Sequence, residues 1–379
     1  MKTILTSIAA GSLLAALAIA QTPRYTITDL GSVGGSPGQP YVITNNGLIG
    51  GAAAIPDGRM HAILWYKGLK LMDIGTPGLG GPNSAAFGVN EFGQTVGQAE
   101  TSVPNGGEDF CGFKALGFPS GTTCLPFLWQ NGVMTKLPTL GGANGFANMI
   151  NIRGEVVGLA ENKTQDPGCP VFQFKPVIWE NGNIQQLPTP PGDPYGVAAW
   201  INDNGQVVGS SGTCAPFNGN SGLNLVENHA LLWQNGTVTD LGNLGGTGAN
   251  AGNHACAINN HGQVVGHSEL PHDTTFHGFL WTVETGMRDL GTLPRDFASA
   301  ANGINDGGDV VGASFDANFN PRAVLWKYGV PFDLNKRIAA NPSGLYLLVA
   351  QSINFSGEIV GVAFQQSTGE VHGFLATPK

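Results

Sequence analysis

The stretch Ile-Asn-Asp-Asn-Gly-Gln-Val-Val-Gly, residues 201–209, decides the fold because versions of it recur along the whole chain. Clear copies occupy residues 258–266 and 304–312, close copies 150–158 and 353–361, a more divergent copy 89–97 and a shortened copy 43–50. The turn glycines of the seven copies run from Gly47 to Gly357, which gives about 52 residues per unit. Repeat periods of this length are typical of β-propellers and solenoids.

A second segment follows each copy of the first one. Its best example is His-Ala-Leu-Leu-Trp-Gln-Asn-Gly-Thr-Val-Thr-Asp-Leu-Gly at residues 229–242. Each unit therefore holds four short runs rich in Val, Ile, Leu and Trp, which are residues that favour strands. Asn-Gly pairs supply the positive φ angles that tight hairpins need between the first and second runs and between the third and fourth. Each unit is predicted to be a four-stranded antiparallel blade.

The two ends of the chain favour a closed ring. The last unit stops after its third strand, near Leu375, whereas residues 25–31 read as a fourth strand with no unit before them. We expect residues 25–30 to pair with residues 373–376 and to complete the seventh blade, because closure removes open sheet edges. The predicted fold class is all-β, a seven-bladed β-propeller forming one domain over residues 21–379. A β-solenoid and two packed β domains are the alternatives.

Composition and the N-terminus narrow the functional classes. Glycine supplies 58 of 379 residues, charged residues only 11%, and the net charge is −9. This balance disfavours a nucleic-acid binder or a basic membrane-surface protein. Residues 1–20 are predicted to be a signal peptide, with Lys2 before an apolar run and Ala18-Ile19-Ala20 as the cleavage site. We expect a secreted protein, extracellular or periplasmic, without a membrane span.

The paired segments resemble the HAF-repeat family of bacterial predicted extracellular repeat proteins, named for the His-Ala-Phe of the second segment. The resemblance covers nearly the whole chain after residue 20. Here the copies read His-Ala-Ile, His-Ala-Leu or His-Gly-Phe, and three units replace the histidine with Leu125, Lys175 and Arg322. The resemblance implies secretion and a repeat fold, and it implies no catalytic residues.

Residues that recur at one place in every unit are interpreted as structural. His61, His229, His277 and His372 should bond to a polar group of their own blade, with a ring of metal-binding histidines as the alternative. Six units also carry a tryptophan in the second segment, and one large ring per blade should fill the wedge between blades: Trp65, Trp129, Trp179, Trp233, Trp281 and Trp326. Trp200 departs from the pattern because it lies in a first strand; it is interpreted as core, with a ligand platform as the alternative. The asparagine of the first segment should order its own hairpin.

All five cysteines follow the predicted leader, so disulfides are allowed. Cys111 and Cys124 share one long loop, and Cys169 and Cys214 lie in equivalent loops of adjacent units. These positions predict the disulfides Cys111–Cys124 and Cys169–Cys214. Cys256 falls in a first strand and is predicted to be a buried free thiol.

Motifs for catalysis are scarce. His267, His272 and Asp273 lie close to His277 in sequence, but they are interpreted as a solvated loop. No zinc-protease motif occurs, and Asn202 to Gly205 lacks most of a calcium loop. A pair of carboxylates for glycoside hydrolysis stays open, since such pairs need no proximity in sequence. No cofactor and no metal is predicted.

Loop lengths place the candidate site. The connections between the second and third strands are long in blades two to four and short elsewhere, and function often sits on such loops. The predicted binding residues are Phe113, Phe118, Tyr195 and Phe217, with Asp193 as a polar partner. The alternatives are that these rings pack the core of their own lobe, or that a ligand binds at the mouth of the central channel.

The predicted function is a secreted, monomeric binding module for an extracellular glycan, peptide or surface polymer. A secreted glycoside hydrolase or lyase is the second hypothesis, and a purely structural role is the third.

Overall fold

The computed structural model describes residues 23–31, 38–66, 70–75, 78–105, 109–167, 169, 172–214, 225–248 and 252–379. The predicted signal peptide, residues 1–20, and Phe217 lie outside these ranges.

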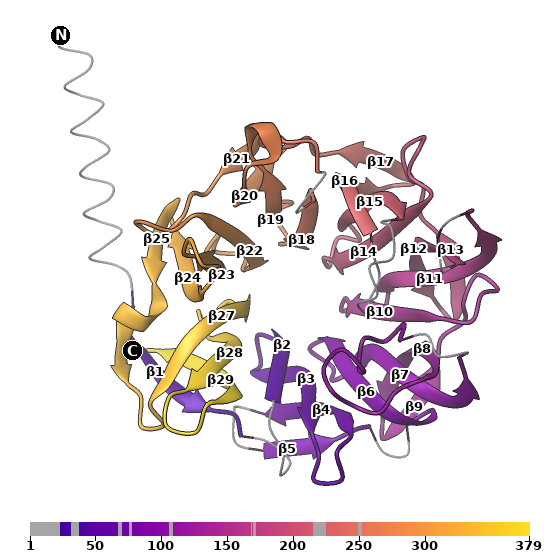
Figure 1. Cartoon of the computed structure of the whole chain (residues 1–379), viewed down its shortest axis with the longest axis horizontal. Coiled ribbons are helices and arrows are strands. Elements are labelled where there is room, and N and C mark those ends of the chain that lie inside the picture. The colour runs from indigo at the N-terminus through magenta and orange to yellow at the C-terminus, as the bar shows by residue number, and fades with distance from the viewer. Residues whose placement is uncertain are drawn as a thin grey trace.

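Seven antiparallel sheets follow one another around a ring (Figure 1). Blades one to three contain β2 (Gly38–Ile43), β3 (Leu48–Ala54), β4 (Met60–Tyr66), β5 (Lys70–Asp73); β6 (Gly80–Val89), β7 (Thr95–Pro104), β8 (Thr122–Gln130), β9 (Val133–Lys136); β10 (Gly145–Ile150), β11 (Val156–Gln165), β12 (Phe172–Glu180) and β13 (Asn183–Gln186). Blades four to six contain β14 (Tyr195–Ile201), β15 (Val207–Cys214), β16 (Leu225–Gln234), β17 (Thr237–Asp240); β18 (His254–Ile258), β19 (Val264–Glu269), β20 (Phe276–Thr282), β21 (Gly286–Asp289); β22 (Ala298–Ile304), β23 (Val310–Phe315), β24 (Pro321–Lys327) and β25 (Val330–Asp333).

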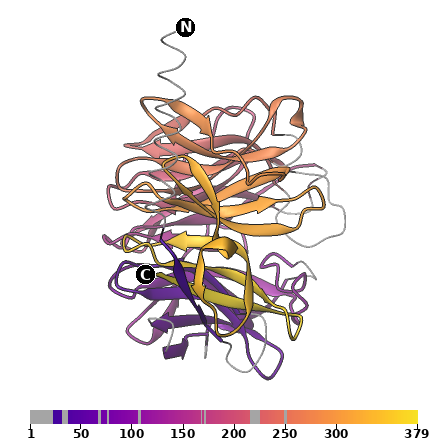
Figure 2. The same ribbon diagram turned by 90° about the vertical axis from the view of Figure 1, so that its left-hand side faces the viewer.

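The seventh blade joins the two ends of the chain, as predicted. Its sheet order is β26 (Ile338–Ala340), β1 (Tyr25–Asp29), β29 (Glu370–Pro378), β28 (Ile359–Gln365) and β27 (Leu345–Ile353). Strand β1 runs antiparallel to β29, with Tyr25 opposite Pro378 and Asp29 opposite Phe374. The indigo β1 lies beside the yellow strands in both views (Figures 1 and 2). The parallel pairing of β26 with β1 was not anticipated from the sequence.

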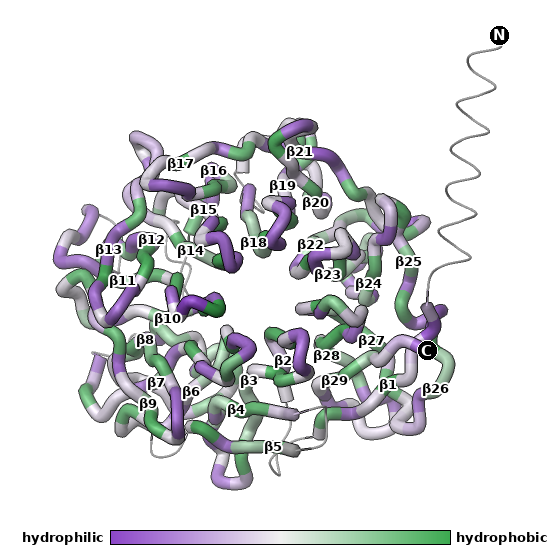
Figure 3. The backbone as a smooth tube through the Cα atoms, turned by 180° about the vertical axis from the view of Figure 1, so that it is seen from behind, coloured by the Kyte–Doolittle hydropathy of each residue, from purple (hydrophilic) through white to green (hydrophobic). Residues whose placement is uncertain are grey.

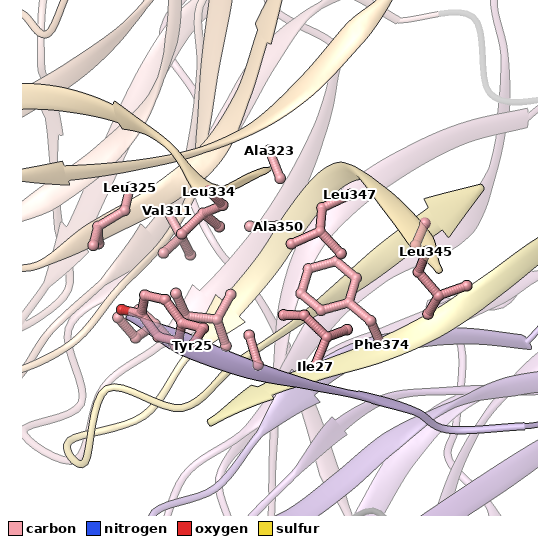
Figure 4. Close-up of a cluster of buried hydrophobic side chains, with 14 residues drawn as sticks. Tyr25, Ile27, Val311, Ala323, Leu325, Leu334, Leu345, Leu347, Ala350 and Phe374 are labelled. Atoms are coloured by element: carbon pink, nitrogen blue, oxygen red, sulfur yellow. The ribbon is translucent and has the colours of Figure 1, made fainter. Parts of the chain in front are cut away.

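The closure is held by a buried apolar cluster (Figure 4). Alternate residues of β1, Tyr25 and Ile27, point into it and meet Phe374 and Leu347 of the same blade. The cluster continues into blade six through Leu325. The period of two along β1 is what a strand with one buried face requires.

The asparagine of the first segment bonds to its own turn, as predicted, and also to the next blade. In blade four, Oδ1 of Asn202 accepts hydrogen bonds from the backbone N–H groups of Asn204 and Gln206, at 3.1 and 2.9 Å. Its Nδ2 donates to the carbonyl of Asn259 in blade five, at 2.9 Å. The same bond to the next blade is made by Asn90, Asn151, Asn259, Asn305 and Asn354.

The chain of asparagine bonds returns to its start at blade one. Asn354 donates to the carbonyl of Thr44, which stands in blade one where the other blades have asparagine. Blade one then reaches blade two through Glu91, whose carboxylate accepts from the backbone N–H groups of Asn45 and Asn46 at 2.7 and 3.1 Å. Hydrogen bonds thus link all seven blades around one mouth of the channel.

The recurring histidines bond within their blades, as predicted. Nδ1 of His61 lies 2.8 Å from a carboxylate oxygen of Asp73, and His277 contacts Asp289 at 2.9 Å. In blade seven, His372 meets Asp29 of β1 at 2.8 Å, so the repeated pair also joins the two ends of the chain. Among the residues that the structure describes, no group of three or more His, Cys, Asp or Glu side chains could hold a metal ion.

Of the six blade tryptophans, Trp129 and Trp281 are partly buried and the other four are buried. Three of the buried ones bond to the preceding crossing. The indole N–H groups of Trp65, Trp179 and Trp233 donate to the carbonyls of Leu30, Pro138 and Pro188. Described helices are limited to the short 3-10 turns η1 (Pro271–Asp273) and η2 (Leu334–Arg337). None of the described helices is long and apolar enough to cross a membrane.

Replacing Ile27 with alanine should lower the free energy of unfolding by about 2–5 kcal/mol, because it opens a cavity in the cluster that closes the ring. Thr28→Ala, at a partly exposed position of the same strand, is the control and should cost much less. Urea unfolding of both purified variants measures the difference. Equal effects would contradict the role of β1 in closure.

Asn202→Ala should lower the free energy of unfolding by about 2–3 kcal/mol, because it leaves turn N–H groups and a neighbouring carbonyl without their buried partner. Asn204→Ala removes an exposed hydrogen bond from the same turn and should have a small effect. Thermal melts monitored by circular dichroism compare the two, and a larger loss for Asn204→Ala would argue against the ring of asparagines.

Candidate functional site

The structure places most of the predicted binding residues inside the long-loop lobe. Phe113 and Tyr195 are 1% and 0% exposed, and Phe118 packs against the same cluster. Tyr195 meets Phe174 edge to face, with ring centroids 5.0 Å apart. Phe113 and Tyr195 therefore face neighbouring side chains and are not free to stack on a ligand, whereas Phe118 is partly exposed. The alternative left open by the sequence, that they pack the lobe's own core, describes their surroundings.

Asp193 is also buried, and both of its carboxylate oxygens accept hydrogen bonds from neighbouring side chains. It accepts hydrogen bonds from Oγ of Ser211 at 2.6 Å, Nδ2 of Asn228 at 3.0 Å and Nδ1 of His229 at 2.7 Å. It therefore fixes strands β15 and β16 of blade four, and it takes the role that the strand-four aspartate has in other blades. Asp240, that aspartate in blade four, lies 3.8 Å from the other nitrogen of His229.

Both predicted disulfides are present. Cys111–Cys124 closes the loop of blade two, with Cα atoms 5.7 Å apart, and Cys169–Cys214 joins the loops of blades three and four, with Cα atoms 6.2 Å apart. They bind the lobe into one unit at the edge of the channel. Cys256 is a free thiol, as predicted, but it is only partly buried. The prediction of full burial is wrong because Cys256 lies at a bulge that faces the channel.

A β-bulge in the first strand of every blade shapes the channel. At each bulge one extra residue of the first strand lies opposite no partner in the second, and such a residue is turned out of the ladder. These seven residues all line one cavity of about 430 Å3 on the long-loop side: Tyr41, Phe87, Asn148, Ala199, Cys256, Asn302 and Gln351.

One wall of this cavity is aromatic and comes from blades one to three. Tyr41 and Phe87 meet edge to face with centroids 5.1 Å apart, and Phe146 follows at 6.0 Å from Phe87. Phe110 of the lobe contacts Phe146 at 6.3 Å. The lobe, which its two disulfides cross-link, thus packs against the side of the aromatic wall that faces away from the cavity.

The remainder of the cavity lining is polar and presents hydrogen-bond acceptors. Nδ2 of Asn148 donates to the carbonyl of Ala198 at 2.9 Å, and Nδ2 of Asn302 donates to Ala350 at 3.0 Å. Within the described part of the chain, Oδ1 of neither amide receives a hydrogen bond. The amides are held by the neighbouring blade, so their oxygens are the groups offered to the cavity. Gln351 adds a third amide.

A carboxylate and an imidazole complete the polar wall. Oε1 of Glu227 lies 2.5 Å from Nδ1 of His254, and both side chains are 19% exposed. Burial by itself raises the pKa of Glu227, but the charge of His254 and its hydrogen bond outweigh burial and lower that pKa to about 2. Burial by itself lowers the pKa of His254, and Glu227 outweighs it, so this pKa is raised. The two groups form an ion pair beside the cavity.

The groups around this pair are not arranged as a nucleophile with its base. Oγ of Ser210 contacts the same Nδ1 of His254 at 3.0 Å and donates to Glu227 at 2.6 Å, whereas a triad uses opposite imidazole nitrogens. Ser210 is also fully buried. Burial, with a contribution from Glu227, raises the pKa of the Cys256 thiol to about 12, which keeps it protonated and unreactive.

Trp200 divides the channel into two chambers. It lines the aromatic cavity and also a second cavity of about 150 Å3 at the opposite mouth, which is bordered by the asparagine turns. It packs against core clusters of blades one and two, four and five, and five and six. The indole of Trp200 therefore lies between the two cavities. Hydrophilic stretches border the central opening in Figure 3.

Apart from Trp200 and Cys256, sequence reasoning did not single out the residues that line the cavity, although the repeats carried a signal for the bulge residues. Each bulge residue stands two positions before the first residue of the repeated segment, and in six blades it follows an alanine, as in Ala86-Phe87 and Ala301-Asn302. The position varies from aromatic to amide to thiol, whereas its neighbours repeat. A position that varies within an otherwise repeated strand indicates a residue that has no structural role in the blade.

No family of known sequences and no curated protein sequence matches the chain. Among solved structures, it is similar to TolB from Acinetobacter baumannii, with 13% identity, 88% of this chain and 67% of that one covered, and a TM-score of 0.46. It is also similar to a puromycin hydrolase, with 14% identity, 94% and 54% covered, and a TM-score of 0.46. A Trypanosoma rangeli sialidase matches at 9% identity, 78% and 53% covered, and a TM-score of 0.36.

The ion pair beside the cavity should make stability depend on pH. Because the pKa of Glu227 is lowered, this group contributes stability above about pH 4.5, and that stability is lost as the pH falls toward about 2. Because the pKa of His254 is raised, this group contributes stability below about pH 6.5, and that stability is lost as the pH rises through the raised pKa of the folded state. Glu227→Gln should therefore cost most between pH 4.5 and 6.5, on the order of 2–3 kcal/mol.

Urea unfolding at a series of pH values measures this cost. Glu284→Gln, which removes an exposed carboxylate from a hairpin of blade five, is the control and should show little effect. A cost of Glu227→Gln that stays constant from pH 5 to pH 9 would mean that the charge on His254 does not contribute.

Proposed function

We propose that this protein is a secreted binding module and that its ligand is a glycan held in the central cavity on the long-loop side. The observation that carries the proposal is the cavity itself: about 430 Å3, lined in part by the rings of blades one to three and in the remainder by fixed acceptor groups. This volume falls within the range of about 300–1,000 Å3 typical of ligand sites, which are mostly apolar with a few placed polar groups.

The two walls complement the two sides of a sugar. The C–H groups of a pyranose ring form an apolar face that packs against aromatic rings, whose negative π face attracts them. Its hydroxyl groups are donors that suit the amide oxygens of Asn148 and Asn302 and the carboxylate of Glu227. A hydroxyl-rich ligand would satisfy acceptors that otherwise rely on water. An extended peptide has fewer donors to offer such a wall.

Binding is favoured over hydrolysis by the charges at the site. Glycoside hydrolases place two carboxyl groups across the scissile bond, one of them a general acid with a raised pKa. Glu227 is the one carboxylate among the described residues that line the cavity, and its pKa is lowered. A carboxylate that stays ionised at neutral pH is poorly suited to donate a proton.

Export is supported by the two disulfides, because such bonds persist in oxidising compartments. The signal-peptide pattern of residues 1–20 and the resemblance to HAF-repeat proteins point the same way. We propose an extracellular or periplasmic location. The completed ring leaves no blade short of a strand, which supports a monomer.

A glycan array probed with the purified protein tests the proposal, followed by titration calorimetry on the sugars that bind. Gln351→Ala and Phe87→Leu should each weaken binding about tenfold or more, because the first removes an acceptor and the second replaces an aromatic face with an aliphatic side chain of similar apolar character. Unfolding curves confirm that both variants fold.

The matched control is Phe355→Ala. This ring is exposed at the opposite mouth, beyond Trp200, so its loss should leave affinity unchanged. Binding that is lost in Phe355→Ala and kept in Gln351→Ala would move the site to the asparagine mouth. The absence of binding to any glycan, with turnover of a glycoside substrate, would favour the hydrolase instead.

A further inference from the structure

A continuous series of aromatic side chains leads from the cavity to the rim of the ring. His254, which lines the cavity, stacks on His267 with centroids 5.7 Å apart and planes 18° apart. The series continues over blades five and six with successive centroids 5.7 to 6.4 Å apart: His267, Phe276, Phe315, Phe319 and Phe297. We call these six residues the aromatic track. It lies on blades five and six, whereas the disulfide-linked lobe belongs to blades two to four.

The outer end of the track is open to solvent. Phe297 is 41% exposed and Phe319 is 56% exposed, and their rings meet edge to face at 6.0 Å. The other four members are partly buried. Adjacent exposed rings on loops, continuous with a cavity, are typical of surfaces that bind a ligand.

Backbone strain gathers around the same part of the molecule. Among the described residues, eight that are not glycine have positive φ. Four belong to the hairpins between third and fourth strands, where tight turns require it: Asn131, Asn181, Asn235 and Tyr328. The other four all lie in the loops that border the track on blades five and six: His272, Asp273, Arg295 and Phe319. Strained residues cluster at ligand sites because function keeps them there.

Phe319 is the clearest case, because blade one contains the same turn without the strain. In blade one, Ile55 N–H bonds to the carbonyl of Arg59, and the left-handed position is held by Gly58 with φ of 83°. In blade six, Asp316 N–H bonds to the carbonyl of Asn320, and the left-handed position is held by Phe319 with φ of 60°. A bulky residue is unfavourable there, and glycine is the residue that such a turn prefers.

We propose that the aromatic track is the outer part of the same site and binds successive units of a glycan chain whose inner unit occupies the cavity. This inference rests on the proposed function and adds that the ligand is a polymer. A chain of sugar rings repeats its apolar face along its length, so it can pack on several rings in succession. A ligand confined to the cavity would not reach Phe319, which is separated from His254 by three intervening rings of the track.

Phe319→Gly tests the track separately from the fold. It restores the residue found in blade one, so the melting temperature should stay within about 4 °C of wild type. Titration calorimetry with a disaccharide and a hexasaccharide of the same linkage, taken from the array, measures binding. The wild type should bind the hexasaccharide at least about tenfold more tightly. Phe319→Gly should lose that advantage and bind the disaccharide as the wild type does.

The control is Phe92→Ala, which removes a more exposed ring from the opposite face and should change neither affinity. The inference is overturned if both ligands bind equally to the wild type, or if Phe319→Gly keeps the advantage of the longer one. A fall in melting temperature well beyond 4 °C would also count against it, since the ring would then be holding its loop. Failure of every sugar to bind overturns the proposed function itself.

Discussion

Closure of the ring is the constraint on which every other feature depends. A sheet edge left unpaired in the seventh blade would expose backbone groups and leave blades six and one without a fixed spacing. Strand β1 removes that edge by pairing with β29, and Ile27 and Tyr25 bury their side chains in the same step. The His372–Asp29 pair then repeats, across the two ends of the chain, a contact that other blades make within one segment.

Because the ring is closed, the two mouths of its channel can differ in chemistry. At one mouth the repeated asparagines form hydrogen bonds with their own turns and with the neighbouring blade. The side chains at this mouth therefore repeat from blade to blade and have a structural role. At the other, the bulges turn one residue per blade inward, and these residues are free to differ. That division of roles explains why Tyr41, Asn302 and Gln351 can occupy equivalent positions without disturbing the fold. Trp200 separates the two regions.

The long-loop lobe and the aromatic track lie on different sides of the channel and have different character. The lobe is cross-linked and has an apolar interior, so it supports the aromatic wall formed by residues such as Phe146. The track ends in short loops, where Phe319 keeps an unfavourable backbone conformation and an exposed ring. Loop length and aromatic content therefore pointed to a structural support, whereas the exposed ring with an unfavourable backbone conformation lies in a short loop.

The sequence by itself determined the repeat, the number of blades, the pairing of β1 with β29 and both disulfides, because these follow from periodicity, from complementary missing strands and from loops that must lie together. It also predicted the bond from His61 to its own blade. It could not show how the candidate residues pack: Tyr195 and Asp193 look accessible in sequence, yet they are buried by neighbours that lie far away along the chain. The cavity unites one bulge residue from each of the seven blades with further residues around them, and the Glu227–His254 pair spans two blades. Only the tertiary structure could show which residues meet in the cavity, because the bulges and ring closure determine which side chains point into the channel. Neither leaves a local sequence pattern as strong as the repeat itself.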